Sequence, residues 1–98
     1  MEVEFDDEAL RRLACDPMFD MGLDRSIVKA YRMRVQLIAA ALDERAFCAL
    51  TSWQLEKLKG DLAGRDSIWL NKQWRLLIRL EKRKSGKTVV IVSICDYH

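Results

Sequence analysis

The fold of this chain is decided by the stretches Trp74-Arg-Leu-Leu-Ile-Arg-Leu-Glu81 and Thr88-Val-Val-Ile-Val-Ser-Ile-Cys95. In the first stretch, large apolar side chains alternate with polar or charged ones over most of its length, and a period of two predicts a half-buried antiparallel strand. The second stretch is apolar at successive positions, which is typical of a central strand with a neighbour on each side. A hairpin loop from Lys82 to Lys87, with Ser85-Gly86 inside it, is predicted to join the two strands.

The residues before this pair supply a third strand. Asp66-Ser-Ile-Trp-Leu-Asn71 alternates, with Ile68 and Leu70 on one face, and a turn at Asn71-Lys72-Gln73 leads into the next strand. At the start of the chain, Glu2-Val-Glu-Phe5 alternates in the same way. We therefore expect a three-strand C-terminal meander, with the N-terminal strand as the candidate neighbour of the central one.

Between these strands the apolar residues follow helical spacing. Asp24 is a good N-cap for a long helix that ends near Asp43-Glu-Arg45. Its apolar face is expected to contact the sheet and consists of Ile27, Tyr31, Val35, Ile38 and Leu42. Short turns are predicted at Ala46-Phe-Cys-Ala-Leu50 and from Ser52 to Leu58.

A shorter helix precedes the long one. Asp6 or Asp7 is expected to cap it, and Asp16-Pro17 is expected to end it. The complete pattern predicts an α+β fold, in which a curved antiparallel sheet is backed by two to three N-terminal helices. Residues 1–98 are expected to form a single domain.

Composition limits the possible classes of protein. The hydrophobic fraction is 50%, and no run of about 20 apolar residues is present that would span a bilayer. The acidic start does not resemble a signal peptide, so the expected location is the cytoplasm. Cys15, Cys48 and Cys95 are widely spaced among apolar neighbours, which predicts reduced thiols in or near the core. No metal site or cofactor is expected.

The charge is distributed unevenly along the chain. Residues 1–50 carry 7 Lys/Arg and 10 Asp/Glu, a net charge of −3, whereas residues 51–98 carry 10 and 5, a net charge of +5. The basic half is the sheet half. The excess of positive charge in this half is what a polyanionic partner requires. A charged surface that only faces solvent has the same composition, so both interpretations stay open.

Several motifs in the second half occur in a specific order. They are Leu58-Lys59-Gly60-Asp61, then Ser67-Ile-Trp-Leu-Asn71 with Trp74-Arg75-Leu76, and a terminal Asp96-Tyr97-His98. Each motif alone is weak, but the ordered set resembles the HigB-type toxins of the RelE superfamily. The resemblance covers most of the chain, including an N-terminal helical half of matching length.

This resemblance implies a compact RelE-like fold and the activity of a toxin in a type II toxin–antitoxin system. Such a toxin is a ribosome-dependent endoribonuclease that cuts mRNA, typically in the ribosomal A site. The implied partners are mRNA, the ribosome and a cognate HigA-like antitoxin with a helix-turn-helix domain. Operator DNA would be bound only through the antitoxin, and no membrane is implied.

The residues themselves suit RNA cleavage by attack of the 2′-OH, which needs a base, an acid and cations but no metal. Lys59 and Arg75 match basic positions of the family and are assigned to the scissile phosphate. His98 is assigned as general acid, because Asp96 and the terminal carboxylate favour its imidazolium form. Tyr97 is expected to stack on a base or to bind a phosphate, and Asn71 to place the nucleotide.

The chain departs from the family at Glu56, where many HigB toxins have histidine. One interpretation is that Glu56 is the general base, and the other is that it is an idle surface residue. Further RNA contacts are predicted for cations near the sheet, namely Lys57, Lys72, Arg79, Lys82, Arg83 and Lys84. Trp74 is expected in the core. For Trp69, a place in the core and stacking on an RNA base are about equally favoured.

Two other functions remain open at this stage. The chain is also compatible with a non-catalytic member that binds the ribosome or RNA, and with a module that only binds the antitoxin. Growth arrest that survives loss of His98 would favour binding, whereas tight antitoxin binding without arrest would favour the interaction module.

Overall fold

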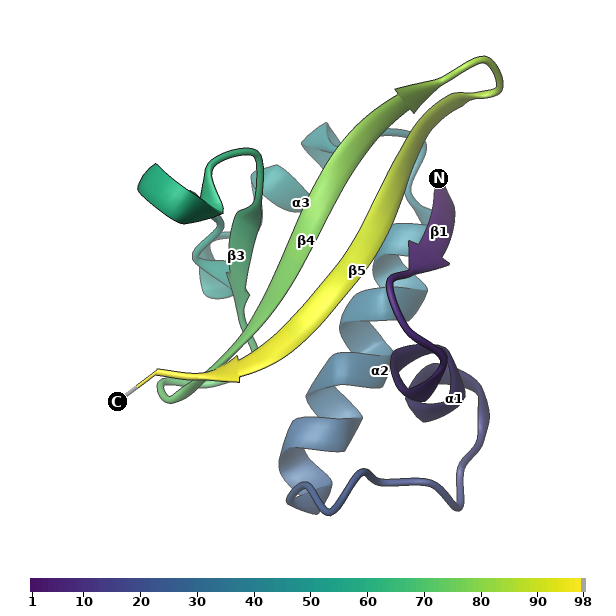
Figure 1. The fold of residues 1–98 in the computed structure, drawn as a ribbon, viewed down its shortest axis with the longest axis vertical. Coiled ribbons are helices and arrows are strands. Elements are labelled where there is room, and N and C mark those ends of the chain that lie inside the picture. Colours follow the sequence, from purple (N-terminus) through teal and green to yellow (C-terminus); the bar gives the residue numbers. More distant parts are fainter. Residues whose placement is uncertain (98) are drawn as a thin grey trace.

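A five-stranded sheet with helices packed on one face makes up the computed structural model, which describes residues 1–97 (Figure 1). The helices are α1 (Glu8–Cys15), α2 (Arg25–Ala40) and α3 (Arg45–Cys48), with the 3-10 turns η1 (Thr51–Trp53) and η2 (Gly60–Leu62). The strands are β1 (Glu2–Phe5), β2 (Glu56–Lys57), β3 (Asp66–Trp69), β4 (Trp74–Arg83) and β5 (Gly86–Asp96). The predicted α+β fold is confirmed.

The order of strands in the sheet is β1-β5-β4-β3-β2. β5 therefore lies between β1 and β4, as the sequence predicts for its most apolar strand. β1 runs parallel to β5, with Val3 opposite Val89, and every other pair in the sheet is antiparallel. The hairpin is tighter than the predicted loop, because β4 continues to Arg83 and β5 begins at Gly86.

β2 is an edge strand that the sequence analysis missed. The predicted turn from Ser52 to Leu58 is wrong at its end, since Glu56 pairs with Ser67 and Lys57 with Asp66. A two-residue strand is too short to show a period, and only its partner in β3 holds it extended.

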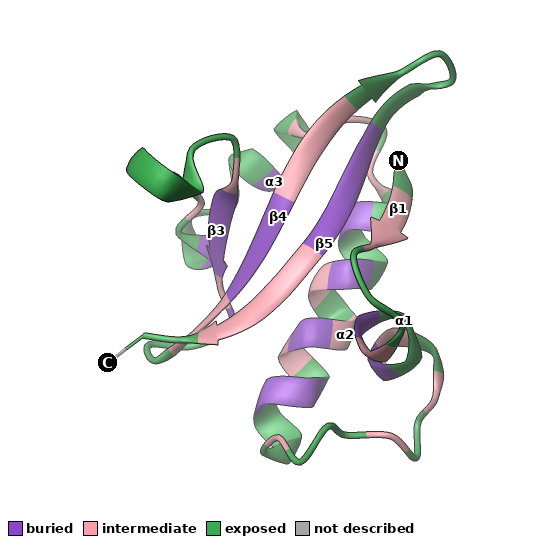
Figure 2. Cartoon of the chain, viewed as in Figure 1, coloured by how far each residue is buried: buried purple, intermediate pink, exposed green. Residues whose placement is uncertain are grey.

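The core lies between the helices and one face of the sheet. α1 and α2 contribute Leu10, Leu13, Tyr31 and Ile38, and the sheet contributes alternate residues of each strand, such as Ile68, Leu76, Ile78, Val89 and Ile91. Trp74 packs against this core, as predicted. Figure 2 shows the buried positions along β3, the middle of β4 and the first half of β5, with an exposed hairpin tip.

α2 is shorter than its apolar pattern predicts. It ends at Ala40, because Ala41 adopts an extended backbone with ψ of 145°. Leu42, which was expected on the apolar face of this helix, is instead 97% exposed. Asp43 then starts a new turn, in which its carboxylate accepts the backbone N–H of Arg45.

Both predicted helix caps are present. The Asp7 carboxylate accepts the N–H of Leu10 over 2.9 Å, and that of Asp24 accepts the N–H of Ser26 over 3.1 Å. The two helices are also joined through the buried Tyr31, whose hydroxyl donates to the Leu10 carbonyl over 2.7 Å.

The three cysteines are free thiols, but the prediction that they lie in or near the core is wrong for two of them. Cys15 and Cys48 are exposed, because each ends a short helix whose apolar residues face the other way, and Cys95 is half-buried. Within residues 1–97, no helix has the length and apolar character needed to cross a membrane.

Candidate functional site

The face of the sheet away from the helices, called here the open face, carries several of the predicted site residues. Cross-strand partners point to the same side of a sheet, so the register assembles neighbouring rows of side chains on this face. These rows are Trp69–Arg75–Cys95 and Glu56–Ser67–Leu77–Ser93. Both lie toward the end of the sheet where β5 runs into Asp96 and Tyr97.

Arg75 is held firmly in the first row. Its Nη1 donates to the carbonyl oxygens of Asn71 and Lys72 over 2.7 and 2.9 Å. Its guanidinium carbon lies 4.2 Å from the ring centroid of Trp69 and 5.5 Å from that of Tyr97. No carboxylate of residues 1–97 forms an ion pair with Arg75, so its charge is available to an anionic ligand.

The turn before β4 is built around Asn71. The Asn71 side-chain oxygen accepts the backbone N–H groups of Gln73 and Trp74 over 2.8 and 2.7 Å. An asparagine suits such a turn because its side chain mimics a backbone acceptor. Asn71 therefore has a structural role besides its predicted role in placing the nucleotide. It stabilises the turn whose carbonyl oxygens accept hydrogen bonds from Arg75.

Gln73 connects this turn to the end of the chain. Its Nε2 donates to Asp96 Oδ1 over 2.9 Å, and its carbonyl accepts the N–H of Tyr97 over 2.6 Å. These bonds fix the end of the chain, and the ring of Tyr97 lies against Arg75. Asp96 is opposite Trp74 in the register, so strand alternation places it on the helix side of β5, away from the open face that carries Arg75. The predicted general acid, His98, lies outside the described residues.

Glu56 lies on the open face, exposed, in the row next to that of Arg75. Glu56 is two strands away from Arg75 across the sheet and two residues away along the strand direction. The strand spacings therefore put the Cα atoms of Glu56 and Arg75 roughly 12 Å apart. Two long side chains span that distance around a bound phosphate. Glu56 and Arg75 therefore face one region of the sheet surface from opposite sides.

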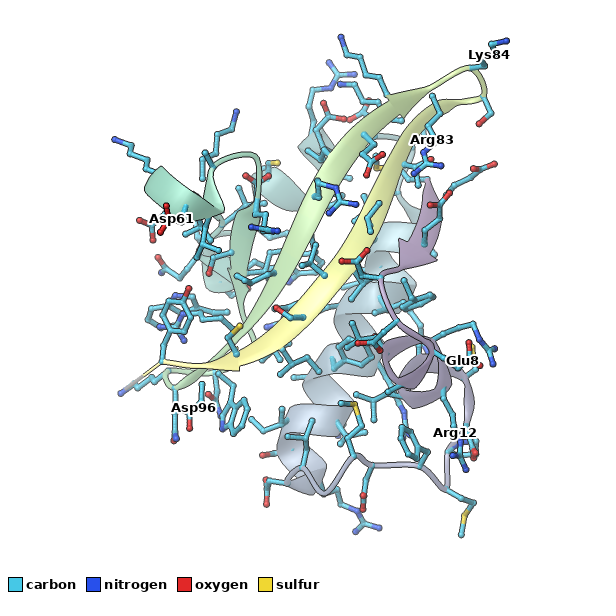
Figure 3. The ribbon with its side chains drawn as sticks, in the orientation of Figure 1. Glu8, Arg12, Asp61, Arg83, Lys84 and Asp96 are labelled. Atoms are coloured by element: carbon cyan, nitrogen blue, oxygen red, sulfur yellow. The ribbon has the colours of Figure 1, made fainter. Side chains whose placement is uncertain are left out.

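Lys59 directly precedes η2 and is exposed. The next residue, Gly60, has φ of +68°, a left-handed conformation that strains any residue with a side chain. The glycine of the Leu58-Lys59-Gly60-Asp61 motif is thus required by the turn that carries Lys59. Figure 3 shows η2, with its labelled residue Asp61, on the same side of the sheet as β3.

Lys57 is separated from this site. Its neighbour Glu56 is on the open face, so strand alternation turns Lys57 to the helix side, opposite Asp66. Burial raises the pKa of the Asp66 carboxyl, and the charge of Lys57 partly opposes that rise. Lys72, in contrast, is exposed in the turn before β4, close to Arg75.

The remaining predicted RNA contacts lie toward the other end of the β4–β5 hairpin. Arg79 pairs with Glu81 over 2.7 Å, and Arg83 pairs with Glu4 and Glu81 over 2.9 and 3.1 Å. Lys82 and Lys84 are exposed, and Figure 3 places Lys84 and Arg83 far from Asp96. The charges of Arg79 and Arg83 are partly neutralised by these carboxylates. The two arginines are therefore expected to bind a polyanion less strongly than Lys82 and Lys84.

Three residues that support the site were not predicted to do so. Gln73 and Trp69 act as described above, and Arg34 on α2 donates through Nε and Nη2 to the Trp69 carbonyl over 3.3 and 3.1 Å. Burial lowers the pKa of Arg34. No local pattern reveals these contacts, because each joins elements that are distant in sequence.

Comparisons with known proteins identify the fold but find no relative by sequence. No protein family and no curated protein matches the chain. Among solved structures, it is similar to a YoeB/ParE toxin from Agrobacterium tumefaciens, with a TM-score of 0.68, 15% identity and full coverage of both chains. This chain has the fold of the YoeB and YafQ toxins.

Two further structures have the same toxin fold. One is a YoeB–YefM toxin–antitoxin complex from Staphylococcus aureus, with a TM-score of 0.58 and 23% identity, covering 100% of this chain and 97% of that one. The other is YafQ from E. coli, with a TM-score of 0.57 and 14% identity, covering 97% and 91%. The toxin fold therefore extends over the whole described chain.

Proposed function

We propose that this chain, over residues 1–98, is the toxin of a type II toxin–antitoxin pair and a HigB-type endoribonuclease that cuts mRNA on the ribosome. The observation that carries the proposal is the placement of Arg75. It is held between the rings of Trp69 and Tyr97, without a carboxylate partner in residues 1–97, and lies across the open face from Glu56. The toxin fold of the solved neighbours supports the same function.

The proposed reaction needs no metal. Glu56 takes the proton of the 2′-OH, whose oxygen attacks the adjacent phosphorus and forms a 2′,3′-cyclic phosphate. The bond from phosphorus to the 5′-oxygen breaks, and His98 gives its proton to that oxygen. Arg75 and Lys59 stabilise the charge that develops on the phosphoryl oxygens, while Tyr97 stacks on a neighbouring base.

The proposed setting is the cytoplasm, where the ribosome presents the mRNA. Lys72, Lys82 and Lys84 are proposed to contact RNA phosphates, and each contact adds to the salt dependence of binding. The proposed partner is a HigA-like helix-turn-helix antitoxin, through which alone the complex contacts operator DNA. A toxin of similar fold is paired with the antitoxin YefM in the Staphylococcus aureus complexes.

Mapping of mRNA ends after a short pulse of expression tests the proposal. The wild-type chain is expected to arrest growth and to create new ends within translated reading frames, whereas Arg75→Ala is expected to create none. Arg45→Ala is a matched control, because Arg45 is exposed and its only ion pair within residues 1–97 is with Asp43. Incubation of purified protein with mRNA, with and without ribosomes, shows whether cleavage depends on the ribosome.

Growth arrest without new mRNA ends would refute the proposed nuclease activity. It would support the second candidate function, which is binding to the ribosome or the antitoxin without catalysis. The observation that favours that candidate is the exposed hairpin with Lys82 and Lys84, which suits RNA binding without catalysis. Arrest that persists in Arg75→Ala would support it.

A further inference from the structure

Arg65, which directly precedes β3, has no role in the proposed reaction as described above. Its backbone is fixed on both sides, because its carbonyl accepts the N–H of Leu58 over 2.9 Å and its N–H donates to the Leu62 carbonyl over 3.1 Å. The bond to Leu58 continues the pairing of β2 with β3 by one residue. Strand alternation therefore directs the Arg65 side chain to the open face, the side that also carries Glu56.

The guanidinium of Arg65 is not used by the rest of the described chain. Within residues 1–97 it forms no ion pair and no hydrogen bond, and its Nε is buried without an acceptor. A buried N–H without an acceptor is costly, and in native proteins it is uncommon unless a water or a ligand supplies that acceptor. A half-buried arginine without a carboxylate therefore indicates a site for an anion.

The neighbour of Arg65 on the next strand strengthens this interpretation. Asp66 is opposite Ile78 in the register, so the preceding residue, Arg65, lies beside Arg79 of β4. Arg79 is already paired with Glu81 over 2.7 Å. Arg65 has instead a like charge as its cross-strand neighbour, an arrangement that destabilises a sheet and that a bound anion relieves.

The open face orders the proposed groups from one end to the other. Tyr97 and Arg75 come first, then Glu56 in the next row, and then Arg65, which is two residues along β3 from Ser67, the partner of Glu56. Strand spacings put the Cα atoms of Arg65 and Arg75 roughly 14 Å apart. Because the Arg75 guanidinium is held at the turn before β4, the two arginines suit two phosphates of one strand better than a single phosphate.

The direction of the strand follows from the proposed acid and base. The 2′-OH that loses its proton belongs to the nucleotide on the 5′ side of the scissile phosphate, and the leaving 5′-oxygen belongs to the nucleotide on its 3′ side. The two oxygens lie roughly in line through the phosphorus, so the base and the acid approach from opposite sides. The proposed acid follows Tyr97 in the chain, whereas Arg65 lies beyond the proposed base, Glu56. Arg65 therefore lies toward the 5′ side.

From these observations we propose that Arg65 binds an RNA phosphate on the 5′ side of the scissile one. The guanidinium donates from Nε and an Nη nitrogen to two oxygens of that phosphodiester. Its role is to hold the strand across the open face, not to stabilise the charge at the reacting phosphorus. The inference rests on the proposed function for the identity of the ligand as RNA and for the direction of the strand.

Two other roles for Arg65 lead to different experimental results. One is packing alone, in which its alkyl stem covers Leu77, a residue of the open face that is only 4% exposed. The other is an ion pair with Glu56 that positions the base. The two side chains are diagonal neighbours across β2 and β3, yet they form no ion pair in the structure.

Binding of a strand that cannot be cut tests the site without catalysis. A fluorescein-labelled 12-mer of deoxythymidine, which has no 2′-OH, is titrated by fluorescence anisotropy between 50 and 200 mM salt. Arg65→Gln and Arg65→Met should each bind about tenfold more weakly than the wild type, and should lower the slope of log K against log salt by about 0.7, the value for one phosphate of a single strand. Methionine keeps the apolar stem, so packing alone would leave its binding unchanged.

The matched control is Arg11→Gln, because Arg11 lies on α1, away from the open face, and pairs with Glu8. This variant should bind like the wild type. Circular dichroism and the melting temperature establish that each variant folds, and the two Arg65 variants keep the test decisive if one of them does not.

Methylphosphonate substitution locates the phosphate. Short RNAs contain the cleavage site mapped from the mRNA ends, a 2′-deoxy sugar at the attacking nucleotide and one uncharged methylphosphonate in turn at each position. In the wild type, substitution of one phosphate on the 5′ side should weaken binding about tenfold, and in Arg65→Gln the same substitution should have no effect. Substitutions on the 3′ side should weaken binding equally in both proteins. A general loss of structure would not give this coupling.

Equal salt slopes for the wild type and both Arg65 variants would overturn the proposal, as would a wild-type chain that does not bind the deoxythymidine strand or a coupling of Arg65 to a phosphate on the 3′ side. In cleavage assays, Arg65→Gln should raise the KM and leave kcat within about twofold. A lower kcat at unchanged KM would instead assign Arg65 to positioning Glu56. Weaker binding by the Arg65 variants without any wild-type cleavage would refute the proposed nuclease and leave the anion site standing.

Discussion

Gln73 holds Asp96, and the residue after it, through two separate hydrogen bonds. Its side-chain amide donates to the Asp96 carboxylate over 2.9 Å, and its carbonyl accepts the N–H of the next residue, Tyr97, over 2.6 Å. The turn that carries Gln73 also supplies the carbonyls that hold Arg75. One short turn therefore sets the position of the proposed phosphate-binding cation and of the terminal residues together.

Gln73→Ala should lower the rate of RNA cleavage by roughly tenfold to a hundredfold, since small displacements of catalytic groups are costly. The loss is expected in the maximal rate more than in the KM, because Arg75 remains in place. Hydrogen exchange should show faster exchange of the Tyr97 amide, a change that is independent of activity. Gln36→Ala, an exposed glutamine-to-alanine change on α2, is the control. A wild-type rate in Gln73→Ala would rule out the positioning role.

Arg75→Ala should reduce cleavage by about a hundredfold or more, as loss of a charge-stabilising donor does in other enzymes. Arg75→Lys should recover only part of that loss, because lysine keeps the charge but not the planar group that lies on Trp69 and binds a phosphate with two donors. Single-turnover rates measure both. Full recovery by lysine would mean that Arg75 acts only as a point charge.

Glu56→Gln should slow single-turnover cleavage by about a hundredfold or more, because the amide cannot accept the proton of the 2′-OH. Glu56→Asp keeps the carboxylate on a shorter side chain and should retain part of the activity. An unchanged rate in Glu56→Gln would leave Glu56 as an idle surface residue.

Tyr31→Phe should lower the free energy of unfolding by about 1–2 kcal/mol, because it leaves the Leu10 carbonyl without its buried donor. Burial, aided by the charge of Asp7, raises the pKa of Tyr31. The folded state therefore disfavours the ionised phenol, and the contribution of Tyr31 to stability is complete below about pH 10 and decreases as the pH rises further. Urea titrations should show that the free energy of unfolding decreases less between pH 8 and pH 11 for Tyr31→Phe than for the wild type.

Lys82→Ala and Lys84→Ala should each reduce the slope of log K against log salt for ribosome binding by about one. Arg83→Ala, at the same hairpin, should have a smaller effect, since Arg83 already pairs with Glu4 and Glu81. Filter binding between 50 and 200 mM salt measures all three variants. Equal slopes for the wild type and the lysine variants would remove the hairpin from the proposed RNA surface.

The strands and helices with strong periodicity were predictable from the sequence. The alternation in β3 and β4, the continuous apolar run of β5 and the caps Asp7 and Asp24 are local signals, and each is confirmed. The two failures have different origins. Leu42 continues the helical spacing but follows a break at Ala41, and Glu56–Lys57 becomes a strand only through β3.

For the candidate site, the sequence could identify residue types but not their surroundings. It pointed to Arg75 as a cation, yet the rings of Trp69 and Tyr97 that hold it come from different strands and from the terminus. It grouped Lys57 with Glu56, which strand alternation places on opposite faces. It also grouped Arg79 and Arg83 with the free lysines, although carboxylates on β1 and β4 partly neutralise both.

By itself, then, the sequence determined the order of the main helices and strands, the buried faces of β3, β4 and most of α2, and the chemical groups available near the terminus, because these depend on neighbours within a few residues. Tertiary structure alone decided which of those groups share the open face and which arginines on it lack a carboxylate partner within residues 1–97. Both depend on strand register and on helix packing, in which the contacting residues are tens of positions apart and leave no local pattern.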